Sequence, residues 1–172
     1  MPDNYYINLR NFDMGARARY DFEPGDQFFS ELGGSDIHRG SLKVGVDVQE
    51  IGGAFRLSFE IHGTVVTTCD RCLSELEADI DFSEEMKIKF GHEASEDDEY
   101  VVIPDSDPGF DCAWLIYELT ALRLPIRRVH APGKCDPEME KRLSEMSVSG
   151  QEPVKEEAID PRWNELKKIL NK

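Results

Sequence analysis

Two runs of alternating apolar residues on either side of a Gly-Gly pair constrain the fold of this chain most strongly. Apolar side chains occupy every second position of 42–48 and again of 55–61, and Gly52-Gly53 separates the two runs. Period-2 alternation is typical of half-buried β-strands, and two such runs around a Gly-Gly pair predict a β-hairpin. Further alternation across 76–90 extends the hairpin into an antiparallel sheet that is long enough to curl toward a half-barrel.

The hydrophobic period changes from two to about 3.6 residues after position 110. Asp111 is a suitable N-cap for a helix that ends before Leu124-Pro125, because the residue before a proline avoids helical geometry. Trp114 belongs to the apolar positions of this helix, and we expect it to be largely buried. One main helix packed across an antiparallel sheet predicts an α+β fold.

Composition divides the 172 residues into three parts. We expect an α+β domain at 1–135, an acidic flexible linker at 136–158 and a C-terminal helix at 159–172. The linker is polar and charge-rich, whereas the last segment regains an apolar stripe at helical spacing. Trp163 belongs to that stripe, and it is predicted to dock the helix onto the domain. The alternative is a free helix that binds a partner through an exposed Trp163.

The charge balance and the absence of targeting signals restrict the function classes. Lys and Arg number 20 against 35 Asp and Glu, which leaves a net charge of −15. Such a field repels nucleic-acid phosphates and favours basic partners. No apolar run is long enough to span a membrane, the N-terminus lacks a signal-peptide pattern, and four cysteines are too few for a disulfide scaffold. These features predict a reduced, cytoplasmic protein that binds neither membrane nor DNA.

Two pairs of metal-ligating residues stand far apart in the chain. Cys69 and Cys72 form a CxxC on a predicted turn between strands, and such a turn aims both thiolates at one point. His130 and Cys135 follow in HAPGKC and complete a Cys3His set, which is a known ligand combination of structural zinc sites. The alternative is a metal-free pair, since reduced cysteine often packs as a small apolar residue.

A thiol redox pair is a weaker alternative. A redox CxxC sits at a helix N-terminus, whereas this one lies between predicted antiparallel strands, and Asp70 between the thiols opposes thiolate formation. Cys112, at the start of the predicted helix, is expected to pack in the core. No phosphate-binding loop, nucleophile elbow or HExxH is present, so we do not expect an enzyme.

One segment is basic in an otherwise acidic chain. Residues 123–135 contain four cations and no acid, and the CxxC contributes a fifth cation if the two segments meet. This set predicts a binding patch for RNA or for an acidic surface, unless the arginines pair with nearby carboxylates. Its members are Arg71, Arg123, Arg127, Arg128 and Lys134.

Several of these motifs occur together in a known family. CDRCL after a hairpin, an Asp-started helix running into Leu-Pro, the H-x4-C loop and a terminal DPRWNEL resemble the YceD family, over roughly residues 42–170. The matching residues are Cys69, Arg71, Cys72, Leu73, Asp111, Leu124, Pro125, His130, Cys135, Asp160, Pro161, Trp163 and Leu166.

The resemblance implies a non-enzymatic role in ribosome biogenesis that supports accumulation of large-subunit (23S) rRNA. It also implies a partner, either a large-subunit ribosomal precursor or a small, basic zinc-ribbon ribosomal protein. The net charge of −15 suits an acidic escort for such a basic protein. Direct RNA binding through the basic segment is the alternative, and a thiol redox protein is the remote one.

Overall fold

The computed structural model describes residues 5–10, 12–92, 95–96 and 100–147, and the chain divides into two units, 1–135 and 136–172. The first unit carries two helices and the strands, and the second carries one described helix. The elements are β1 (Tyr6–Asn8), β2 (Arg17–Phe22), α1 (Asp26–Leu32), β3 (Arg39–Ile51), β4 (Ala54–Thr68), β5 (Glu75–Gly91), β6 (Ser95–Glu96), β7 (Val101–Pro104), β8 (Gly109–Asp111), α2 (Ala113–Arg123) and α3 (Pro137–Met146).

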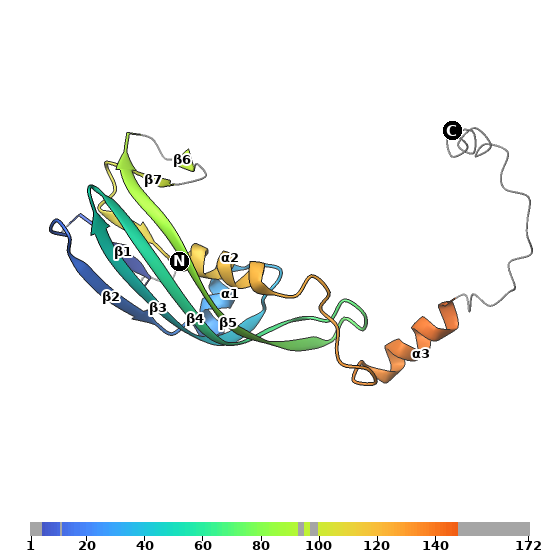
Figure 1. The fold of residues 1–172 in the computed structure, drawn as a ribbon. Coiled ribbons are helices and arrows are strands. Elements are labelled where there is room, and N and C mark those ends of the chain that lie inside the picture. Colours follow the sequence, from blue (N-terminus) through green and yellow to red (C-terminus); the bar gives the residue numbers. More distant parts are fainter. Residues whose placement is uncertain (1–4, 11, 93–94, 97–99, 148–172) are drawn as a thin grey trace, which may run out of the picture. The chain divides into compact units, whose positions relative to one another are not determined.

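The three long strands β3, β4 and β5 form the body of the larger sheet (Figure 1). Ile51 pairs with Ala54 across a two-residue turn, where Gly52 and Gly53 have φ of 61° and 89°. Glycine adopts these positive φ values without strain, and they are the values that a tight hairpin turn requires. The predicted hairpin is therefore confirmed, with its turn at the predicted glycines.

The strand order of this sheet is β2-β3-β4-β5-β7-β6, and a second sheet pairs β1 with β8. All these pairs are antiparallel except β5 with β7, which is parallel. The predicted α+β class with a mostly antiparallel sheet is thus confirmed. The sheet is open and not strongly curled, so the half-barrel is not confirmed (Figure 1).

The core lies on one face of the larger sheet, against α1 and α2. Alternate residues of β4 point into it, and Phe59 and Ile61 are completely buried. Phe29 of α1 and Ile116 of α2 join the same cluster. The alternate strand residues and the residues on one face of α2 therefore pack together in a single apolar layer.

The prediction that Trp114 is largely buried is wrong, since its side chain is 47% exposed. The buried positions of α2 are Ala113, Ile116, Tyr117 and Thr120, a spacing that defines one helix face. Trp114 lies at the flank of that face and stacks on the Tyr117 ring, with the ring centroids 5.4 Å apart. Only one face of α2 is buried against the core, and Trp114 does not belong to that face.

The beginning of the predicted linker contains a helix. Asp136 is the N-cap of α3, because its side chain accepts a hydrogen bond from the Met139 backbone N–H at 2.9 Å. The predicted C-terminal helix at 159–172 and Trp163 lie outside the described residues. None of the helices in the described ranges has the length and hydrophobicity to cross a membrane.

Candidate metal centre

The CDRC turn (residues 69–74) connects the end of β4 to the start of β5. The Cys69 N–H donates to the Ser74 carbonyl, and the Leu73 N–H donates to the Cys69 carbonyl, both at 2.9 Å. Leu73 has φ of 61°, a left-handed conformation that non-glycine residues adopt rarely. These features close the turn tightly enough to place the Cys69 and Cys72 thiols on the same side.

The segment that follows α2 is hydrogen-bonded directly to this turn. The Asp70 N–H donates to the Arg128 carbonyl, and the Arg128 N–H donates to the Asp70 carboxylate, both at 2.7 Å. Farther along, the Lys134 N–H donates to the Ala131 carbonyl at 2.9 Å, and Gly133 has φ of 75°. This second turn returns the HAPGKC loop (residues 130–135) to the thiols.

Cys69, Cys72, His130 and Cys135 consequently form one cluster, with all four ligand atoms within 4.8 Å of one another. The His130 Nδ1 lies 3.4 Å from the Cys72 Sγ and 3.9 Å from the Cys135 Sγ. A tetrahedral site with Zn–S of about 2.3 Å and Zn–N of about 2.1 Å places neighbouring ligand atoms about 3.6–3.8 Å apart. The two distances from His130 are close to this spacing. The cluster could hold a metal.

The His130 ring is held in the tautomer that a metal ligand needs. Its Nε2 lies 3.0 Å from the Glu75 carbonyl oxygen. A carbonyl oxygen only accepts, so Nε2 carries the proton and Nδ1 presents its lone pair to the sulfur atoms. A hydrogen bond from the second ring nitrogen to a carbonyl is the usual support of a metal-bound histidine.

The thiols of the cluster differ in their tendency to ionise. Burial raises the pKa of Cys69, but hydrogen bonds from the Cys72, Arg71 and His130 backbone N–H groups outweigh it and lower the pKa. Burial raises the pKa of Cys135 to about 11, with further contributions from Cys72 and Cys69. Backbone donors around a sulfur favour its thiolate, which is the form that binds a metal.

Cys112 is separate from the cluster. It is completely buried, and burial together with the Asp111 charge raises its pKa to about 12. The expectation that Cys112 packs in the core is confirmed. The N-cap of α2 is Cys112, whose side chain makes no cap hydrogen bond, so the prediction that Asp111 is the N-cap is wrong by one residue. The Asp111 carboxylate still accepts a hydrogen bond from the first helical N–H, that of Ala113, at 2.9 Å.

The predicted basic residues do not share one environment. The Arg128 guanidinium bonds the Asp36 carboxylate at 2.8 Å and lies 3.5 Å from that of Asp70. Arg123 pairs with Glu84 on β5 and lies over the Phe82 ring, with its Cζ 4.8 Å from the centroid. Two arginines of the predicted patch are therefore neutralised by carboxylates within the domain.

Three other members of the predicted patch belong to the two segments that form the cluster. Arg71 lies inside the CDRC turn, Lys134 lies in the HAPGKC loop, and Arg127 lies just before that loop. Arg127 and Lys134 are exposed. Trp163, the remaining predicted binding residue, lies outside the described residues.

The acids that position the site are not among the residues predicted from the sequence. Asp70 was expected only to disfavour thiolate formation, yet it bonds the neighbouring segment by its backbone and by its side chain. Asp36, which binds the Arg128 guanidinium, lies 92 positions away along the chain. The position of Asp70 inside the CxxC could have indicated its role in the turn, whereas no sequence feature near Asp36 indicates its pairing with Arg128.

The fold and this cluster together define an α+β protein with a candidate structural metal centre. Residues 57–170 match the family described as Large ribosomal RNA subunit accumulation protein YceD. The match covers more than half of the chain and includes all four cluster residues, so the chain belongs to the YceD family. No curated protein and no solved structure matches the chain.

Proposed function

We propose that this protein supports the accumulation of large-subunit (23S) rRNA in the cytoplasm, as an assembly factor that catalyses no reaction. The observation that carries the proposal is the family match, which extends over the CDRC turn, α2 and the HAPGKC loop. The family is described by its role in accumulation of large-subunit rRNA. A cluster in which all four ligand positions come from the protein suits a structural role, because a catalytic metal keeps one position for substrate or water.

Zinc is the metal that we propose for the cluster. Thiolate and imidazole ligands in a tetrahedral arrangement are the set that structural zinc sites use. In the described part of the HAPGKC loop, Cys135 is the buried residue, so apolar packing alone holds this loop weakly. Zinc bound by Cys69, Cys72, His130 and Cys135 would join the loop to the CDRC turn and so stabilise the end of the domain.

We propose that the protein acts through a basic ribosomal protein, either free or within a large-subunit precursor. The net charge of −15 supports this route, because a strongly acidic surface accelerates encounter with a basic client and repels RNA. A basic zinc-ribbon protein of the large subunit fits this description. Shielding such a client from non-specific RNA contacts would favour its correct incorporation.

Direct RNA contact is the second candidate, and exposure of Arg127 and Lys134 beside the cluster favours it. The ion pairs of Arg123 and Arg128 reduce the charge that this surface offers to a phosphate backbone. Charge reversal of Arg127 and Lys134 separates the two routes. It should abolish cross-linking to RNA if RNA is contacted directly, and it should leave binding to a basic protein unchanged.

The test is complementation of a strain that lacks this protein, with the ratio of large-subunit to small-subunit rRNA as the readout. We expect a reduced ratio without the protein and recovery with the wild type. A variant with Cys69→Ser and Cys72→Ser should fail to restore the ratio, whereas Cys112→Ser, which alters a core thiol outside the cluster, should restore it. An unchanged ratio in the deletion strain would refute the proposed function.

A further inference from the structure

One edge of β5 is open along most of its length. The strand pairs with β4 from Glu75 to Lys89, which is all but its last two residues. On its other side, β7 pairs with it only from Ile88 onward. Between residues 76 and 86, no strand and no backbone hydrogen bond from the described part of the chain reaches this side.

Two hydrogen bonds show which residues of β5 direct their backbone groups outward. The Glu75 carbonyl accepts from the His130 Nε2, and the Gly91 carbonyl accepts from the Asp105 N–H, so both point away from β4. In a β-strand every second residue directs its N–H and C=O to the same side. Lys87 and Lys89, near β7, share this orientation. In the open stretch the residues that share it are Glu77, Asp79, Asp81, Ser83 and Glu85.

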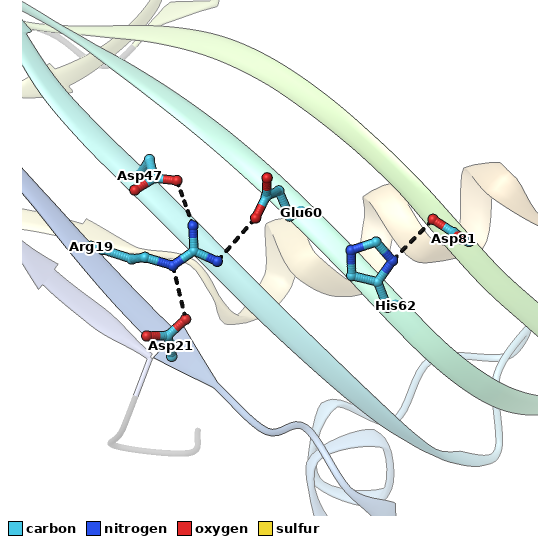
Figure 2. A network of polar contacts seen from close by, with 6 residues as sticks. All are labelled: Arg19, Asp21, Asp47, Glu60, His62 and Asp81. Carbon is cyan, nitrogen blue, oxygen red and sulfur yellow. Dashed lines mark hydrogen bonds and ion pairs between the residues drawn. The ribbon is translucent and has the colours of Figure 1, made fainter.

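The same residues place their side chains on the solvent-facing side of the sheet, where all five are exposed. Four of the five are acidic. In Figure 2, His62 bonds Asp81, and the Arg19 guanidinium already contacts three carboxylates, those of Asp21, Asp47 and Glu60. Among the described residues, no ion pair involves Glu77, Asp79 or Glu85. The edge therefore combines available backbone groups with uncompensated negative charge.

The opposite face of the open edge is mainly apolar, apart from Glu84, which pairs with Arg123 of α2. Ile80 is buried, and Leu76, Ala78 and Phe82 are partly buried. A strand added beside β5 would meet acidic side chains on one face and apolar side chains on the other. Its complementary sequence alternates basic and apolar residues.

We propose that the open edge of β5 takes up an extended, basic segment of the client protein by strand addition. This inference rests on the proposed function, because it assigns a binding site to the basic client. Main-chain hydrogen bonds supply affinity in strand addition, and alternate side chains supply specificity. A second copy of this chain is a poorer occupant, since pairing two such edges would oppose acidic rows.

Ser83 offers a test that changes the backbone donor without changing charge. Ser83→Pro removes one outward N–H and leaves the hydrogen bonds to β4 in place, because proline is tolerated at an edge strand. The control is Ser83→Ala, which keeps the N–H. The probe is a synthetic peptide in which lysine and valine alternate, titrated against the full chain. We expect Ser83→Pro to bind about tenfold more weakly than Ser83→Ala.

Hydrogen exchange of the outward amides supplies a second measurement that does not depend on the proline variant. Bound peptide should slow exchange at residues 77, 79, 81, 83 and 85 of the wild type. If Ser83→Pro does not fold, a variant with Glu77→Lys and Asp79→Lys replaces it and should bind the peptide more weakly.

The proposal is overturned if the peptide does not bind, if it binds without slowing these amides, or if the two Ser83 variants bind equally. It is also overturned if a folded Ser83→Pro chain, unable to bind the peptide, fully restores the rRNA ratio. In that last case the proposed function would stand, because the wild type would still be required for rRNA accumulation. Failure of the wild type to restore the ratio would instead refute the proposed function.

Discussion

Replacing Arg128 by methionine removes a guanidinium that lies between two carboxylates while keeping most of the apolar stem. The Arg128 side chain is 27% exposed, and it bonds Asp36 at 2.8 Å and lies 3.5 Å from Asp70. Asp70 belongs to the CDRC turn, so Arg128 connects three segments: that turn, the segment after α2 and the chain that precedes β3. The ion pairs of Arg128 are therefore expected to stabilise the fold around the cluster.

The magnitude follows from these contacts. A hydrogen bond between charged partners contributes about 1.5–3 kcal/mol, and an exposed ion pair contributes about 0.2–1 kcal/mol. Asp36 and Asp70 are 48% and 41% exposed, so water screens both interactions and the lower part of the first range applies. We expect Arg128→Met to lower the free energy of unfolding by about 2 kcal/mol, which corresponds to roughly 6–10 °C in Tm for a domain of this size.

The assay is thermal unfolding of the zinc-saturated protein, followed by circular dichroism. Arg127→Met is the matched control, because Arg127 is the exposed neighbour in the same segment, and its effect should stay within about 0.5 kcal/mol. A double-mutant cycle with Asp36→Asn should show coupling to Arg128 and none to Arg127. Equal effects of the two arginine variants would refute the reasoning and return Arg128 to the candidates for RNA contact.

Three further predictions concern the sheet and the cluster. Gly63→Ala should lower the free energy of unfolding by about 2 kcal/mol or more in a urea titration, since Gly63 has φ of 145° and an added Cβ would lie 2.2 Å from a backbone oxygen of β3. The Glu50 carboxylate accepts hydrogen bonds from the Gly15 and Gly53 N–H groups, which lower its pKa below the ordinary 4.5. Its stabilisation is therefore full above that value and is lost as the pH falls through the lowered pKa, so Glu50→Gln should be less stable than wild type at neutral pH and converge with it in acid. Free zinc at a hundred times its Kd should stabilise the wild type by about 2.7 kcal/mol in a calorimetric scan, and it should not stabilise Cys135→Ser to this extent.

Much of the sheet and of the cluster is predictable because their signals are local. Alternation with period two identifies β3, β4 and β5, and the Gly52-Gly53 turn then determines which residues face one another. The cluster is predictable for a related reason. The CxxC on a turn and the H-x4-C on a loop each supply two of the four ligands. The fold then needs only to place the two segments next to each other.

The remaining features depend on contacts between distant segments. Trp114 has the hydrophobicity of a core residue, but the sheet covers only the face of α2 that carries Ile116 and Thr120. Asp36, the partner of Arg128, lies 92 positions away along the chain. The sequence therefore predicts a basic patch at 123–135, although carboxylates from distant segments neutralise part of its charge. The open edge of β5 depends on β7 being short and pairing only near its end, which no local pattern of β5 reveals.

Metal content tests the cluster most directly. The full chain, purified under reducing conditions without added metal, is weighed by native mass spectrometry next to the Cys112→Ser variant and the variant with Cys69→Ser and Cys72→Ser. We expect a single zinc ion in the wild type and in Cys112→Ser, and none in the double variant. A folded, reduced wild type that carries no zinc, and takes up none when zinc is added, would show that the four residues converge without forming a metal site.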